Sequence, residues 1–127
     1  MTDRARYGWI AGRVLLSLIF ILSALGKLAN LGGTAQFMAA AGIPLTRLFL
    51  AGAIVFELGG GISVATGYRA RVGALALIVF LIPTTLIFHD FWTVSGLERQ
   101  TQLINFMKNV AIMGGLLLVV FARDEAS

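Results

Sequence analysis

The chain contains no cysteine and a single histidine, and these two shortages remove several kinds of chemistry. Without thiols it cannot carry out thiol–disulfide exchange, hold an iron–sulfur cluster through cysteine, or build a thiolate zinc site. A haem held between two imidazoles needs two histidines, so His89 cannot bind one unless two copies of the chain each contribute. We therefore expect no metal site, and the sequence identifies no catalytic residues.

Charged residues are also scarce. They make up 13% of the 127 residues, whereas soluble domains typically contain about 25%. Hydrophobic residues make up 58%, and the mean hydropathy is +0.90, which indicates an integral membrane protein. Because each membrane span takes about 20 residues, residues 1–127 have room for one domain of four spans. The net charge of +4 then reflects membrane topology, and we expect no nucleic-acid partner.

Four apolar runs predict the membrane-spanning helices. They cover about residues 9–26, 45–66, 72–88 and 103–121. Short connections make consecutive spans antiparallel, and backbone groups in lipid must be hydrogen-bonded within their own helix. We therefore predict an all-α fold, an up-down bundle of four transmembrane helices. The connections at about 30–43 and 91–102 are expected to be short interfacial segments that cap the bundle on one side.

The distribution of cations predicts the orientation. When Arg13, Lys27 and Lys108 are set aside because they fall inside helices, the cations favour the side that holds the termini. This bias places both termini in the cytoplasm. The basic start, the apolar run and the small residues at 23–26 also resemble a cleavable leader. We favour a first span, because cleavage would destroy an otherwise regular pattern of four.

Several polar residues lie where a membrane helix would otherwise carry leucine. In hydrocarbon such groups are costly unless they face a shared interior and pair with one another. The residues 105, 108 and 109 are spaced i, i+3, i+4 and share a helix face, and residues 89 and 90 end the third span. In an up-down bundle the candidate ligand-binding residues gather at the outer end: Lys27, His89, Asp90, Asn105, Lys108 and Asn109.

Glu57 lies near the middle of the second span. A bare carboxylate at that depth costs on the order of 3 kcal/mol or more. Arg13 lies about one turn inside the same membrane boundary, and its long side chain could bridge the offset in depth. We predict that Glu57 either forms a buried ion pair with Arg13 or is protonated. A structural bridge between helices and a proton-linked role both stay open.

The predicted outer cluster combines cations, amides, an imidazole and a carboxylate beneath an aromatic rim. The rim consists of Phe88, Phe91, Trp92 and Phe106. This mixture suits a planar, lipid-soluble molecule whose oxygens accept hydrogen bonds while its ring lies against apolar walls. A quinone fits this description, and so does an anionic lipid head group.

The segment 12–44, the second span with Glu57 followed by glycines, FHDFW at 88–92 and NFMKNVAIMGG at 105–115 occur in a specific order. In this order and spacing they resemble the DoxX family of small bacterial multipass membrane proteins. The resemblance implies a four-span protein of the bacterial inner membrane. By motif, Arg13, Glu57 and the six outer residues match the polar positions of the family. The family takes its name from a subunit of a thiosulfate:quinone oxidoreductase, so it implies a redox partnership.

These observations predict an accessory or quinone-binding subunit of a membrane redox system, with membrane lipid and a redox protein as partners. We expect no covalent cofactor, and whether the chain is an enzyme stays open because it shows no catalytic motif. The alternative is a non-catalytic protein that binds lipid or organises a complex through the same cluster. A third possibility is transport or isomerisation, which would require a cavity that passes Glu57. The small-residue helix faces would allow a homo-oligomer.

Overall fold

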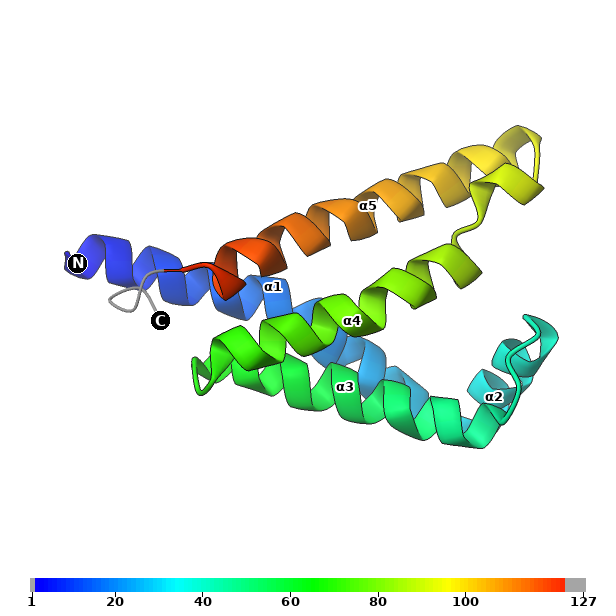
Figure 1. Cartoon of the computed structure of the whole chain (residues 1–127), viewed down its shortest axis with the longest axis horizontal. Coiled ribbons are helices and arrows are strands. Elements are labelled where there is room, and N and C mark those ends of the chain that lie inside the picture. The colour runs from blue at the N-terminus through cyan, green and yellow to red at the C-terminus, as the bar shows by residue number, and fades with distance from the viewer. Residues whose placement is uncertain (1, 123–127) are drawn as a thin grey trace.

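The computed structural model describes residues 2–122, which form five α-helices and one short 3-10 turn (Figure 1). The elements are α1 (Asp3–Ala29), α2 (Leu31–Ala40), α3 (Thr46–Thr66), α4 (Ala70–Phe88), η1 (Phe91–Thr93) and α5 (Gly96–Val120). The helices α1, α3, α4 and α5 are long and apolar enough to cross a membrane. The predicted all-α, four-span fold is therefore confirmed, and α2 is the predicted short helix between the first two spans.

Two spans begin earlier than the apolar runs indicated. The first begins at Asp3 because the Thr2 hydroxyl accepts a hydrogen bond from the Ala5 N–H at 3.1 Å and so caps the helix. The last begins at Gly96, and its first turns contain polar residues with Glu98 near the positive end of the helix dipole. Most of the predicted interfacial segment 91–102 is therefore helical.

The spanning helices contact one another in the order α1, α3, α4, α5, and each is antiparallel to its neighbour (Figure 1). The end that holds Asp3 and Ala122, here called the termini end, is closed, and there Leu16 of α1 lies against Gly115 of α5. At the opposite end, here called the α2 end, α4 and α5 diverge from α1 and α3 (Figure 1). The bundle is therefore closed at one end and splayed at the other.

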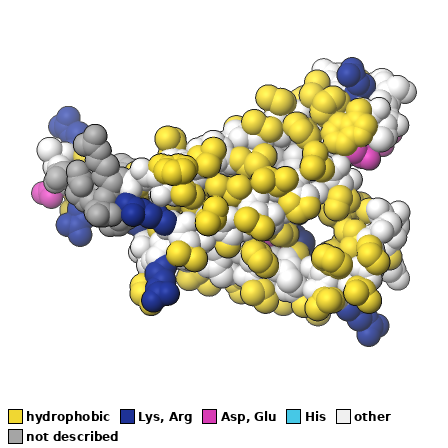
Figure 2. All heavy atoms as spheres, in the orientation of Figure 1, with side chains coloured by type: hydrophobic (Ala, Val, Ile, Leu, Met, Phe, Trp, Pro, Cys, Tyr) yellow, Lys and Arg dark blue, Asp and Glu magenta, His cyan; other side chains and the backbone are white. Residues whose placement is uncertain are grey.

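The buried core lies in the half of the bundle nearer the termini end. It consists of Phe20, Val64, Ala70, Ala74, Leu77, Leu81, Leu116 and Val119. Within α5, all of which the structure describes, the buried residues are Leu116 and Val119, both close to its C-terminus. Hydrophobic side chains also cover most of the outer face in view, where they would contact lipid (Figure 2). The splayed half of the bundle is therefore held together by fewer buried interhelical contacts than the half nearer the termini end.

Glycine allows α3 and α4 to approach closely. A Cβ placed on Gly60 of α3 would lie 2.6 Å from Leu77 Cγ and 3.1 Å from the Gly73 carbonyl oxygen of α4. Leu77 is fully buried, so it has no free space into which to move. Small residues at such positions let membrane helices pack backbone against backbone.

This contact gives a first prediction. We expect Gly60→Ala to lower the stability of the protein by about 1–3 kcal/mol, because the added methyl overpacks the α3–α4 contact. Thermal unfolding of the purified protein in detergent would measure the change. The matched control is Gly59→Ala, because a Cβ at Gly59 meets nothing within 4 Å. The control should be neutral or stabilising by up to about 1 kcal/mol through helix propensity. Equal destabilisation by both variants would contradict the packing argument.

Candidate functional site

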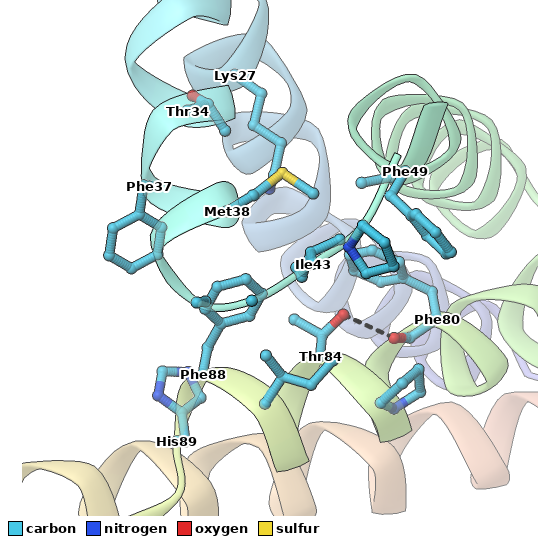
Figure 3. A pocket seen from close by; sticks show the side chains of 16 residues that line it. Lys27, Thr34, Phe37, Met38, Ile43, Phe49, Phe80, Thr84, Phe88 and His89 are labelled. Atoms are coloured by element: carbon cyan, nitrogen blue, oxygen red, sulfur yellow. Dashed lines mark hydrogen bonds between the residues drawn. The ribbon is translucent and has the colours of Figure 1, made fainter. Parts of the chain in front are cut away.

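A cavity of about 580 Å³ lies at the α2 end (Figure 3). Its walls come from α2 and the following loop, from α3 near Phe49 and Ala53, and from the last turns of α4. In Figure 3, Met38 of α2 lies on the opposite side of the cavity from Thr84 of α4, and Phe37 of α2 lies beside Phe88 of α4. Apart from two threonines, the polar side chains among the lining residues are Lys27 and His89. The cavity is thus an apolar space with two nitrogen-bearing groups in its wall.

Aromatic rings supply much of this wall. Phe37 and Phe88 stack with their centroids 5.4 Å apart and their planes at 16°, which joins α2 to the end of α4. Phe49 and Phe80 also line the cavity. The sequence pointed to Phe88 as part of an aromatic rim, but gave no signal that Phe49 and Phe80 would face the same space.

Proline 83 interrupts the hydrogen bonding of α4 beside the cavity. Its ring removes the N–H that would bond the carbonyl of Val79. In the next turn the hydroxyls of Thr84 and Thr85 donate to the carbonyls of Phe80 and Leu81, at 2.8 Å and 2.6 Å. The α4 wall of the cavity therefore contains a local weakness in its backbone hydrogen bonding.

Lys27 and Glu57 form an ion pair between α1 and α3. The Lys27 Nζ donates to Glu57 Oε1 at 2.5 Å and to Ser23 Oγ at 2.7 Å. The Glu57 side chain is 4% exposed, and that of Lys27 is 22% exposed. Each charge provides the partner that the other needs inside a membrane domain. Lys27 also lines the cavity, whereas Glu57 is not among the lining residues, so Glu57 anchors the cation from behind the wall.

The predicted ion pair between Arg13 and Glu57 is wrong. The partner of Glu57 is Lys27, and Arg13 lies against Gly67, which follows Glu57 by ten residues, or about 15 Å along a helix. The antiparallel register explains the error, because Arg13 is level with Gly67, Ile21 with Gly61, and Lys27 with Glu57. A depth counted from an approximate membrane boundary does not determine the register between α1 and α3, so the sequence did not reveal which cation pairs with Glu57.

Two of the predicted outer residues connect α4 to α5. The Nδ1 atom of His89 lies 2.9 Å from Gln102 Oε1, and the Asn109 amide donates to the Thr85 hydroxyl at 3.0 Å. His89 also lines the cavity, whereas Asn109 is not among the lining residues. Apart from its place in a polar segment, nothing in the sequence indicated that Gln102 would be the partner of His89.

The remaining predicted residues lie elsewhere. The Asp90 carboxylate accepts a hydrogen bond from the Thr93 hydroxyl at 3.0 Å within the turn before α5. Asn105 is half-buried and Lys108 is exposed, and neither lines the cavity. Of the six candidates, the structure thus brings Lys27 and His89 to the cavity, and Asp90, Asn105, Lys108 and Asn109 belong to the α4–α5 side. Their part in ligand binding stays a prediction.

Among residues 2–122, no group of three or more histidine, aspartate or glutamate side chains is placed to hold a metal ion.

The predicted aromatic rim is divided in the same way as the polar cluster. Phe91, Trp92 and Phe106 form an edge-to-face group with centroids 5.2–6.1 Å apart. This group lies at the start of α5, apart from the residues that line the cavity.

Four spanning helices, an interhelical ion pair and an apolar cavity define a small multipass membrane protein with a polar interior site. Residues 8–90 match the DoxX family. The chain therefore belongs to the DoxX family, as the sequence motifs predicted.

The relatives of the chain include two proteins of Escherichia coli strain K12. The chain is 34% identical over 117 residues to inner membrane protein YphA, covering 92% of the chain and 84% of that protein. It is 35% identical over 119 residues to inner membrane protein YqjF, covering 94% of the chain and 86% of that protein. The present chain is accordingly a multipass protein of the inner membrane. The cytoplasmic placement of its termini stays a prediction.

A more distant relative is the Surfeit locus protein 4 homolog of Schizosaccharomyces pombe. It is 29% identical over 131 residues, which cover 97% of the chain and 38% of that protein. No solved structure matches the chain.

The ion pair gives a second prediction. We expect Lys27→Met and Glu57→Leu each to lower stability by about 2 kcal/mol or more, because each leaves one charge in an apolar site without its partner. The double variant should recover most of this loss, since both charges are removed together. Thermal unfolding in detergent of the parent, the two single variants and the double variant measures the coupling. Additive losses in the double variant would show that the pair does not stabilise the bundle.

Proposed function

We propose that the protein binds a lipid-soluble quinone in the cavity at the α2 end and acts as an accessory subunit of a membrane redox system. The observation that carries the proposal is the Lys27 ammonium in the wall of an apolar, aromatic-lined cavity. The cavity volume of about 580 Å³ lies within the range of roughly 300–1,000 Å³ that is usual for small-molecule sites.

Hydrogen-bonding capacity supports this choice of ligand. An ammonium has three N–H groups, and two of those on Lys27 are bonded to Ser23 and Glu57. The third can donate to a carbonyl oxygen of an oxidised quinone. A neutral imidazole that donates from Nδ1 to Gln102 presents Nε2 as an acceptor, which suits the hydroxyl of a reduced quinol.

The walls and the opening of the cavity suit the rest of such a molecule. The ring would lie against the phenylalanine side chains, which offer apolar faces at the right depth. Phe37 lines the cavity and is 65% exposed, so the cavity reaches the outer surface of the helices. Figure 2 shows the molecule notched at this end, between the two diverging arms. An isoprenoid tail could leave through this opening into lipid.

An accessory role fits the chemistry that the chain contains. The sequence has no cysteine and one histidine, so electron transfer would come from a partner protein. The family resemblance, with its redox theme, supports the same assignment. In this proposal Lys27 and His89 hold and orient the ring, and Glu57 holds the Lys27 ammonium in position.

A binding experiment tests the proposal. We expect purified protein in detergent to bind a short-chain ubiquinone or menaquinone analogue, and the Lys27→Met/Glu57→Leu double variant to bind about tenfold less tightly, because the donor to the carbonyl is gone. Ala53→Phe should weaken binding at least as much, because its ring would occupy the cavity. Equilibrium titration followed by quinone absorbance or tryptophan fluorescence would measure the affinities.

The matched control is Lys108→Met, which removes the same charge from an exposed residue outside the cavity. It should keep the parent affinity within about twofold. If the parent binds no analogue, or if Ala53→Phe binds as well as the parent, the cavity is not a quinone site. Native mass spectrometry distinguishes the alternative, because a phospholipid retained in the parent and lost in Ala53→Phe would assign the cavity to lipid.

A further inference from the structure

A second polar site lies at the termini end, on the face of α1 that contains Trp9 and Arg13. Arg13 is 8% exposed. Its Nε atom and the Trp9 Nε1 atom are buried and have no hydrogen-bond partner among the described residues. The two residues are four apart on one helix, so their side chains lie on the same face. Two N–H donors on one helix face, one of them part of a cation, therefore lack an acceptor among residues 2–122.

The acidic residues that the structure describes do not neutralise Arg13. Asp3 precedes it by ten residues on α1, and Glu57 is bound to Lys27. Asp90 and Glu98 belong to the opposite, α2 end of the bundle. The other two acidic residues of the chain, at 124 and 125, lie outside the described residues. A buried guanidinium without a counterion is costly in a membrane domain, and such a residue points to an anionic ligand.

The surroundings of Arg13 are suited to an anion. Its Nη1 atom lies against Gly67, the residue that ends α3 with a φ of +83° and has no side chain to cover the guanidinium. Exposed Arg4, Arg6 and Arg69 add positive charge at the same end. Trp9 is of the type that membrane proteins place at the level of the lipid head groups. Basic clusters at this level attract anionic lipids.

We propose that Arg13 and Trp9 form a phosphate-binding site that holds the head group of an anionic phospholipid. The planar guanidinium matches the geometry of phosphate oxygens, and the indole N–H supplies a further donor. Fourteen residues, or about 21 Å of helix, separate Arg13 from Lys27, so this site is distinct from the cavity. The proposal does not depend on the quinone assignment.

Lipid binding tests the proposal directly. Purified protein would be titrated with phosphatidylglycerol or phosphatidylcholine in detergent, and bound lipid counted by native mass spectrometry. We expect the parent to prefer phosphatidylglycerol, and Arg13→Gln to bind it about tenfold less tightly through the loss of charge-assisted bonds. The control Arg47→Gln makes the same change of charge at an exposed position at the opposite, α2 end and should stay within about twofold.

A second set of variants keeps the test decisive if Arg13→Gln does not fold. Trp9→Phe keeps the ring but removes one donor, and we expect a loss of several-fold in phosphatidylglycerol affinity. Equal affinity in the parent and Trp9→Phe, or equal losses in Arg13→Gln and Arg47→Gln, would overturn the site. Inorganic phosphate that displaces the lipid only from the parent would support it.

Asp124 and Glu125 lie outside the described residues, so a separate variant tests whether their carboxylates bind Arg13. We expect Asp124→Asn/Glu125→Gln to leave the preference for phosphatidylglycerol unchanged. If this variant instead loses as much thermal stability as Arg13→Gln, and added lipid stabilises neither the parent nor the variant, the chain's own carboxylates bind Arg13 and the lipid site is refuted.

Discussion

The low tolerance of hydrocarbon for unpaired charge is the constraint on which the rest of the structure depends. Glu57 lies in the middle of a membrane helix, where a carboxylate must find a partner. Lys27 supplies it at 2.5 Å, and this contact joins the last turn of α1 to the middle of α3. The same register places Ile21 against Gly61 and Arg13 against Gly67. The ion pair and the packing contacts between α1 and α3 therefore require the same alignment of the two helices.

The packed core and the cavity lie at opposite ends of the bundle. The tightest packing lies toward the termini, where Leu77 and Leu116 are fully buried. Toward α2 the helices diverge, and a cavity lined by rings and by Lys27 takes the place of the core. A small chain cannot fill both halves and still keep an interior space, so the core occupies one end and the cavity the other. Arg13, whose Nε atom has no partner among residues 2–122, lies on the packed side and is not part of the cavity.

Much of the fold could be predicted from the sequence, and less of the site. Apolar runs of about 20 residues specify spanning helices strongly, because lipid excludes the alternatives. The sequence marked the polar residues at 27, 57 and 89 because charge within an apolar run has few explanations, and the structure places Glu57 in the interior and the other two in the cavity wall. The partner of each polar residue depends on the register and tilt of the helices, which no local sequence pattern encodes. For this reason Glu57 was predicted to pair with Arg13, whereas it pairs with Lys27. Phe49 and Phe80 look like any lipid-facing phenylalanine until α4 is placed against α2.

The interruption at Pro83 has a mechanical consequence. Bending a helix is easiest where a backbone hydrogen bond is already missing, and in α4 that point lies in the wall of the cavity instead of in the packed half. Bending of α4 is therefore favoured at the α2 end of the bundle, because its first turns contribute to the buried core with Val64 and Leu116. The same polypeptide thus combines a firmly packed base with a more pliable rim, so that a change in the width of the rim need not disturb the core.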